Sequence, residues 1–232
     1  MKRVVLLLLM TTVFSLNAQS NDALKNHYEK FYTQMKSQGD VQGVINALTH
    51  LNVLDPSQGR LDTLAVLYMN EGRHIQALNT IGIEPKADDS DMAVEVKAVS
   101  LQALGEAAKA IPHFEELFKR APNVLIAYEL AELKTQTDDL EGAFRHITYG
   151  LANAEDGLLR TYYETQGAYQ VPVKAAFTYL KSLVKFKENP ETNMDIAIGL
   201  LDEAIAIAPN FNLAIVSKQA IEAQKNAPKQ GN

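Results

Sequence analysis

The sequence has 232 residues, of which 47% are hydrophobic, 7% aromatic and 22% charged, and it contains no cysteine. This balance is typical of a globular chain that can bury a core, and it excludes a disordered protein and a disulfide scaffold. A net charge of −6, with no basic cluster larger than Lys119-Arg120, excludes a nucleic-acid binder, which needs a basic stripe. Abundant Ala and Leu favour an all-α fold.

Residues 1–18 follow the pattern of a secretory signal peptide. A basic start at Lys2 and Arg3 precedes an apolar run that ends at Leu16, and a cut after Ala18 fits a small-residue cleavage site. The run is shorter than the roughly 20 apolar residues of a membrane-spanning helix. We therefore expect an exported protein, periplasmic or secreted, with no stable membrane insertion after cleavage and a mature charge of 20 − 28 = −8. An uncleaved segment that tethers the chain to the membrane is the alternative.

After this segment, residue types recur every 33 positions. We call the residues at one equivalent position of successive periods a column. In one column the side chains are mostly small, and its members are Tyr32, Ala65, Ala98 and Ala131. A turn column holds Gly39, Gly72, Gly105 and Asp138. A second mostly small column holds Val44, Ala77, Ala110 and Ala143, and a large apolar column holds Leu48, Ile81, Phe114 and Ile147. Each period therefore predicts a helix, a tight turn and a second helix, and such hairpins bury their apolar faces by stacking.

The period divides the chain into predicted segments within one domain over residues 19–226. Four repeats are expected near 23–56, 57–89, 90–122 and 123–155. The 33-residue period then stops near 155–172, where we expect an irregular insertion over residues 156–172. A late helical pair over 173–209, a closing helix over 210–226 and a disordered tail over 227–232 complete the prediction. Asp40, Asp91, Asp138 or Asp139, Asn193 and Asn210 are expected at helix starts, where their side chains can accept backbone hydrogen bonds.

These columns carry a resemblance to a known family. Ala98, Leu101, Gly105, Ala110, Phe114 and Pro122 follow its pattern, as do Ala65, Tyr68, Gly72 and Ala77. The sequence resembles the tetratricopeptide repeat family, including its exported bacterial members. The resemblance implies an all-α, right-handed superhelical solenoid of antiparallel helical hairpins.

The irregular insertion leaves two structures open. β-branched and aromatic residues flank Gln166-Gly167, which suits a short β-hairpin, but an irregular helix is also possible. The tyrosines at 162, 163, 169 and 179 could form a recognition patch or pack the insertion against the helices, and we favour packing.

The sequence predicts no catalytic residue, no metal site and no cofactor. The five histidines show no metal-binding spacing, and no cysteine can assist them. The adjacent carboxylates Glu115-Glu116, Asp88-Asp89 and Asp138-Asp139 are expected to be solvated at helix ends or on exposed faces. No phosphate-binding loop or nucleophile elbow occurs.

The resemblance implies that the first helix of each pair lines a concave groove that binds a peptide segment. The residues carried over to this predicted groove are Glu29, Asp62, Val66, Met69, Glu95, Val99, Gln102 and Tyr128. Its acids beside an apolar strip favour a basic or amphipathic protein partner. We therefore expect a non-enzymatic interaction module or adaptor in the bacterial envelope. A ligand- or glycan-binding or processing accessory protein is the alternative.

Overall fold

The computed structural model describes residues 21–165 and 167–227. The predicted signal peptide over 1–18 and all but the first residue of the predicted tail lie outside the described residues. The chain divides into two compact units, with the boundary between Leu104 and Gly105. Each unit is described by itself, so the single domain expected over 19–226 stays a prediction.

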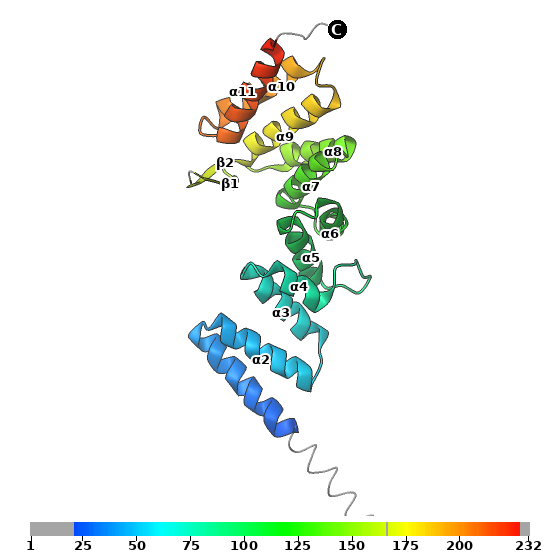
Figure 1. Cartoon of the computed structure of the whole chain (residues 1–232), viewed down its shortest axis with the longest axis vertical. Coiled ribbons are helices and arrows are strands. Elements are labelled where there is room, and N and C mark those ends of the chain that lie inside the picture. The colour runs from blue at the N-terminus through cyan, green and yellow to red at the C-terminus, as the bar shows by residue number, and fades with distance from the viewer. Residues whose placement is uncertain (1–20, 166, 228–232) are drawn as a thin grey trace, which may run out of the picture. The chain divides into compact units, whose positions relative to one another are not determined.

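The first unit is built from helices that pair in sequence order (Figure 1). Residues 21–38 are helical. They are followed by α2 (Val41–Leu54), α3 (Gln58–Asn70), α4 (His74–Ile81) and α5 (Asp91–Ala103). Helix α3 packs against α4 and α5, while Tyr32 and Met35 pack against the buried cluster formed by α2 and α3.

The second unit combines helical pairs with a short β-hairpin (Figure 1). Its elements are α6 (Ala107–Arg120), α7 (Val124–Gln136), α8 (Leu140–Asn153), β1 (Leu159–Glu164), β2 (Gly167–Pro172), α9 (Val173–Glu188), α10 (Met194–Ile207) and α11 (Asn212–Asn226). Helices α7 and α8 form one antiparallel pair, and α9 and α10 form the next. The predicted class of helical hairpins is confirmed.

The turn column of the sequence adopts one backbone conformation. Gly39, Gly72, Gly105 and Asp138 all have positive φ, between 61° and 76°. Glycine reaches this left-handed region without a steric penalty, and Asp tolerates it better than most residues. The 33-residue period therefore placed the tight turn between paired helices correctly, including at the position where Asp replaces glycine.

The small and large columns form the contacts between helices. Ala65, Ala98 and Ala131 are fully buried, as are Ala77, Ala110 and Ala143. Leu48, Ile81, Phe114 and Ile147 are also buried. Small residues let two helix backbones approach closely, and the large residue one turn later fills the space beside the crossing.

Helix starts agree with the sequence in part. Asp40 accepts a hydrogen bond from the Gly43 backbone N–H at 2.8 Å, and Asp139 accepts one from Gly142 at 2.9 Å. Ser90, rather than the expected Asp91, caps α5 through the N–H of Ala93. Asn193 is the N-cap of α10 but its side chain makes no capping hydrogen bond. The N-cap of α11 is Phe211 rather than the expected Asn210.

The predicted insertion is an antiparallel two-stranded hairpin, which settles the alternative left open by the sequence. Leu159 pairs with Pro172, and Glu164 pairs with Gly167. Val171 is fully buried and Tyr162 nearly so, within the same core cluster as α7, α9 and α10. Within the described residues, no helix has the length and apolarity that crossing a membrane requires.

Candidate functional site

The first helices of the first unit keep most predicted groove residues accessible. Glu29 and Glu95 are exposed. Val66, Met69, Val99 and Gln102 are half-buried, and Val66 and Met69 pack against the cluster that contains Val96. This surface, which we call the first-helix face, comprises residues 21–38, α3 and α5. It carries the exposed carboxylates of Glu29 and Glu95 together with half-buried apolar side chains.

Asp62 does not belong to the accessible surface. Only 3% of Asp62 is exposed, because its carboxylate accepts hydrogen bonds from Ser90 Oγ at 2.6 Å and from Gln58 Nε2 at 2.8 Å. Ser90 is the N-cap of α5, so its hydrogen bond to Asp62 links α3 to the start of α5. The predicted exposure of Asp62 in a groove is therefore wrong, since the carboxylate is used inside the fold.

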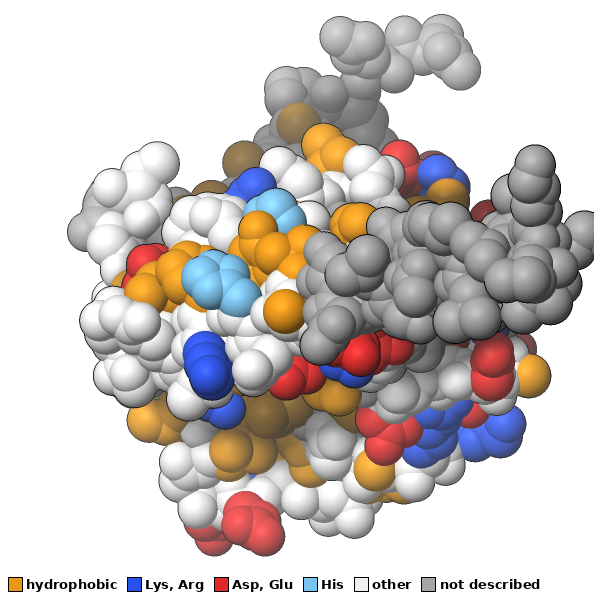
Figure 2. Space-filling view, turned by 90° about the horizontal axis from the view of Figure 1, so that it is seen from below, with side chains coloured by type: hydrophobic (Ala, Val, Ile, Leu, Met, Phe, Trp, Pro, Cys, Tyr) orange, Lys and Arg blue, Asp and Glu red, His pale blue; other side chains and the backbone are white. Residues whose placement is uncertain are grey.

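Hollows in the first unit lie beside the same helices. An open, polar hollow of about 560 Å³ follows one side of residues 21–38 and includes Glu29 and Thr33. A more apolar pocket of about 300 Å³ lies between residues 21–38, α2 and α3, with Tyr32, Val44 and Leu67 in its wall. The space-filling view in Figure 2 shows hydrophobic, acidic, basic and histidine side chains intermingled on one face, so that no single charge covers it.

Tyr128 is covered by the β-hairpin of the second unit. The residue is 1% exposed, and its hydroxyl lies 2.6 Å from the hydroxyl of Tyr162 in β1. The guanidinium carbon of Arg160 lies 3.7 Å from the centre of the Tyr128 ring. Tyr128 therefore cannot be an accessible groove contact in this structure. The prediction of Tyr128 as a groove contact is therefore wrong, because Arg160 and Tyr162 of the insertion cover it.

Arg160 also contacts two carboxylates of α7. Its Nη1 lies 2.8 Å from Glu129 Oε1, and its Nη2 lies 3.6 Å from Glu132 Oε2. Burial raises the pKa of Glu132, and Arg160 offsets part of that rise. Burial lowers the pKa of Arg160, but Glu129, Tyr128 and Glu132 together outweigh burial, and the net pKa is raised. This cluster could not be predicted from the sequence, because Arg160 lies about one period away from Glu129 and Glu132 and in a separate element.

Aromatic rings connect the hairpin to the last helices. Tyr162 lies 5.1 Å and Tyr169 lies 6.5 Å from Phe211, measured between ring centres. Tyr179 of α9 lies 5.1 Å from the same ring. Packing, the favoured reading of these tyrosines, is therefore confirmed for all three. Tyr163 differs, because it is 84% exposed.

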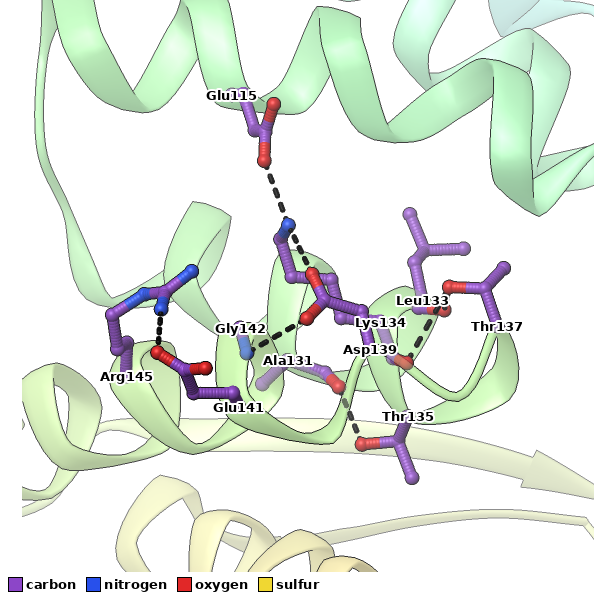
Figure 3. A network of polar contacts seen from close by, with 10 residues as sticks. All are labelled: Glu115, Ala131, Leu133, Lys134, Thr135, Thr137, Asp139, Glu141, Gly142 and Arg145. Atoms are coloured by element: carbon purple, nitrogen blue, oxygen red, sulfur yellow. Dashed lines mark hydrogen bonds and ion pairs between the residues drawn. The ribbon is translucent and has the colours of Figure 1, made fainter.

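The carboxylates expected to be solvated pair with buried lysines. Asp89 lies 2.5 Å from Nζ of Lys97, and the two side chains are 7% and 0% exposed. Nζ of Lys134 lies 2.7 Å from Glu115 and 2.8 Å from Asp139, the N-cap of α8 (Figure 3). The expectation of solvation is therefore wrong for Asp89. Each cluster joins elements of the fold, and the described residues include no group of His, Asp and Glu that could hold a metal.

Comparison with solved structures identifies folds of the same kind. The MamA protein matches with 15% sequence identity and a TM-score of 0.53, over 89% of this chain and 98% of that chain. A tetratricopeptide repeat protein from Parabacteroides merdae matches with 14% identity and a TM-score of 0.45, over 84% of this chain and 70% of its own. No family model matches the chain, and no curated protein matches its sequence. The helical pairs, the turn column and the likeness to MamA together show a tetratricopeptide-like fold.

Proposed function

We propose that this protein is a non-enzymatic interaction scaffold that binds a segment of a protein partner along the first-helix face of its first unit. The observation that carries the proposal is the exposure of Glu29 and Glu95, with the half-buried Val66, Met69 and Val99 on the same set of helices. Stacked helical repeats offer extended surfaces of this kind to peptide segments. Asp62 and Tyr128 are not part of the proposed site, because both are buried.

The charge of the first-helix face favours a basic or amphipathic segment. Glu29 and Glu95 can attract cationic side chains, while the half-buried apolar residues supply area that a partner can cover. Opposite potential accelerates encounter, and burial of apolar surface adds affinity. The net charge of −6 acts in the same direction over longer distances.

A catalytic role is not proposed, because the charged clusters inside the fold already serve to join elements. Lys97 binds Asp89 beside α5, and Lys134 joins α6, α7 and the start of α8. Arg160 joins β1 to α7. The proposed scaffold acts by positioning a partner rather than by transforming a substrate.

Reversal of the two exposed acids tests the proposed site. The variant Glu29→Lys/Glu95→Lys should retain the helical circular dichroism of the wild type and lose capture of the partner in pull-downs analysed by mass spectrometry. A suitable control is Glu71→Lys/Asp88→Lys, which makes the same change of charge at exposed positions outside the predicted groove. Equal capture by both variants would place the binding site elsewhere.

We further propose that the protein acts in the bacterial envelope or outside the cell. The proposal is supported by the signal-like pattern of residues 1–18, with its basic start and apolar run. N-terminal sequencing of the protein purified from its native host should begin at Gln19. A sequence that begins at Met1 in the membrane fraction would instead support a tethered protein.

A further inference from the structure

The β-hairpin covers a surface that the repeat would otherwise present to a partner. Tyr128 and Glu132 of α7 lie one 33-residue period after Glu95 and Val99 of the predicted groove. Equivalent positions of a repeat occupy equivalent places on its helical pair. The side of α7 that bears Tyr128 and Glu132 therefore corresponds to the first-helix face of the first unit, but here it is occupied.

Strand β1 supplies the groups that occupy this side of α7. Arg160 and Tyr162 alternate with outward-facing residues, so both point to the helix while Tyr163 remains 84% exposed. The guanidinium of Arg160 lies against the Tyr128 ring and reaches Glu129, and the Tyr162 hydroxyl bonds that of Tyr128. A flat cation on an aromatic ring with a carboxylate at its edge is a specific mode of arginine recognition.

The hairpin also contacts the start of α11, a later helix of the second unit. The Tyr162 ring packs on Phe211 at the start of α11, and Asn210 donates a hydrogen bond to the Gln170 carbonyl at 3.1 Å. Asn212 donates a hydrogen bond to the Glu164 carboxylate. Through Tyr162 and Phe211 the hairpin therefore spans from α7 to α11, in the way that an extended peptide crosses successive repeats.

One hydrogen-bond donor of Arg160 is not used in this contact. Arg160 faces Glu129 and Glu132, and all three side chains are at least 70% buried. Arg160 Nε is buried without a hydrogen-bond partner in the described part of the chain. A buried donor without a partner is costly, which limits how tightly Arg160 holds the hairpin.

We infer that the hairpin Leu159–Pro172 is a built-in ligand of the α7 surface, and that this surface accepts a strand in which an arginine and a tyrosine lie two residues apart. In the second unit, the hairpin covers the side of α7 that is equivalent to the first-helix face, which stays uncovered in the first unit. An external segment can reach α7 only by displacing the hairpin, and it must bring the same arginine and aromatic groups. The inference concerns the second unit alone and does not depend on the proposed function.

Removal of the hairpin and return of its sequence as a separate peptide tests the inference. The backbone N–H of Val173 donates to the Leu158 carbonyl at 2.8 Å, so the two ends are adjacent and a Gly-Ser-Gly bridge can replace residues 159–172. The probe is a fluorescein-labelled peptide of residues 159–172, followed by fluorescence anisotropy. We expect the bridged chain to bind this peptide and the wild-type chain, whose surface is occupied, not to bind it.

Matched variants identify the contacts in this assay. Glu129→Gln/Glu132→Gln in the bridged chain, or Arg160→Gln in the peptide, should weaken binding by about ten-fold or more because a charge-assisted pair is lost. Lys174→Gln, which removes an exposed ion pair with Asp156 outside the contact, should leave binding unchanged. A folded bridged chain that does not bind the peptide, or binds it equally after the glutamate changes, would overturn the inference.

A second measurement decides the question if the bridged chain fails to fold. In the full chain, Arg160→Gln should accelerate hydrogen exchange in residues 159–165 and 167–172 while α7, α8 and α9 keep their protection. That pattern is expected of a bound ligand whose contact is weakened. If protection in the hairpin is unchanged, or is lost only together with that of α9, the hairpin is an integral core element and the inference is wrong.

Discussion

Gly150 and Gly199 both lie inside helices, but their surroundings are opposite. A Cβ atom on Gly150 of α8 would lie 2.0 Å from Cζ of Phe177, whereas a Cβ atom on Gly199 of α10 would meet nothing within 4 Å. Phe177 is fully buried and contacts the Tyr128 ring. Gly150 is therefore the residue that lets α9 approach α8 closely enough to bury this phenylalanine.

Alanine substitution at the two glycines should have opposite effects. Gly150→Ala should lower the free energy of unfolding by about 1–3 kcal/mol, since Phe177 has to move. Gly199→Ala should raise it by about 0.5–1 kcal/mol, since alanine is the better helix former and space is available. Urea unfolding followed by circular dichroism measures both, and a stabilised Gly150→Ala protein would contradict the packing described for Phe177.

The ion pair between Asp89 and Lys97 links the stability of the first unit to pH. Burial raises the pKa of Asp89. Hydrogen bonds from the Lys97 side chain and the Lys86 backbone help to lower the pKa by more than burial raises it, so the net pKa lies below the usual 3.8. A carboxyl with a lowered pKa in the folded state stabilises the fold above its unfolded pKa. That contribution is lost as the pH falls from about 4 through the folded pKa.

Asp89→Asn should therefore destabilise the protein most at neutral pH. The variant leaves Lys97 buried without its partner charge, which should reduce the free energy of unfolding by about 3 kcal/mol or more at pH 7. The difference from the wild type should begin to shrink below about pH 4, where Asp89 of the unfolded chain takes up a proton, and should go on shrinking as the pH falls through the lowered pKa of the folded state. Urea titrations at pH 7 and pH 3 give the two differences, and a difference independent of pH would exclude the ion pair as its source.

At the scale of elements, Tyr162 and Tyr169 of the hairpin and Tyr128 and Tyr179 of helices α7 and α9 have pKa values that are shifted in the same direction. Burial raises the pKa of Tyr169 to about 12 and raises those of Tyr128, Tyr162 and Tyr179 above their usual value of 10. The fold therefore favours the neutral phenols. Their contribution to stability is complete below pH 10 and is lost as the pH rises from 10 through the raised pKa values.

An alkaline titration should show these tyrosines as a separate group. We expect absorbance at 295 nm to rise in two phases, with Tyr169 titrating near pH 12 in the later phase and with loss of the near-ultraviolet circular dichroism of packed aromatic rings in that phase. In guanidinium chloride all nine tyrosines should ionise in one phase near pH 10. A native protein that titrates in that same single phase would show that the hairpin is not held against α7 and α11.

The same elements show how far the sequence could predict the structure. Residue types that recur at a fixed period can be assigned a structural role from the sequence. Gly105 lies in the tight turn, Ala98 at the crossing of two helices, and Phe114 in the space beside such a crossing, as their spacing indicates. Asp62 could not be predicted in the same way. Its partner Ser90 lies 28 residues away and is outside the repeating pattern, so only the packed helices reveal the hydrogen bond.

The candidate site shows the same limit. Glu29 and Glu95 are exposed, and exposure of this kind can be predicted from helical periodicity, whereas their place in a binding groove stays a prediction. The burial of Tyr128 could not be predicted, because it depends on an insertion whose strands were undecided and whose docking partner had no sequence signal. The insertion is also where the 33-residue period stops, so the repeating pattern carries no information about it.

At the scale of the whole molecule, the two units use one type of helical pair in two ways. The first unit keeps the first-helix face open, whereas the second covers the equivalent side of α7 with its own hairpin. We therefore propose that residues 21–38, α3 and α5 bind the partner, whereas the face of α7 in the second unit is already filled by the hairpin.

Hydrogen–deuterium exchange of the chain with and without its captured partner tests this division of roles between the two units. Bound partner should slow exchange of amides in residues 21–38, 58–70 and 91–103, while the exchange of residues 159–165 and 167–172 stays unchanged. The reason is that a segment on the first-helix face restrains local opening of the helices it contacts. Slowed exchange confined to α2 and α4, or to the hairpin, would contradict the account.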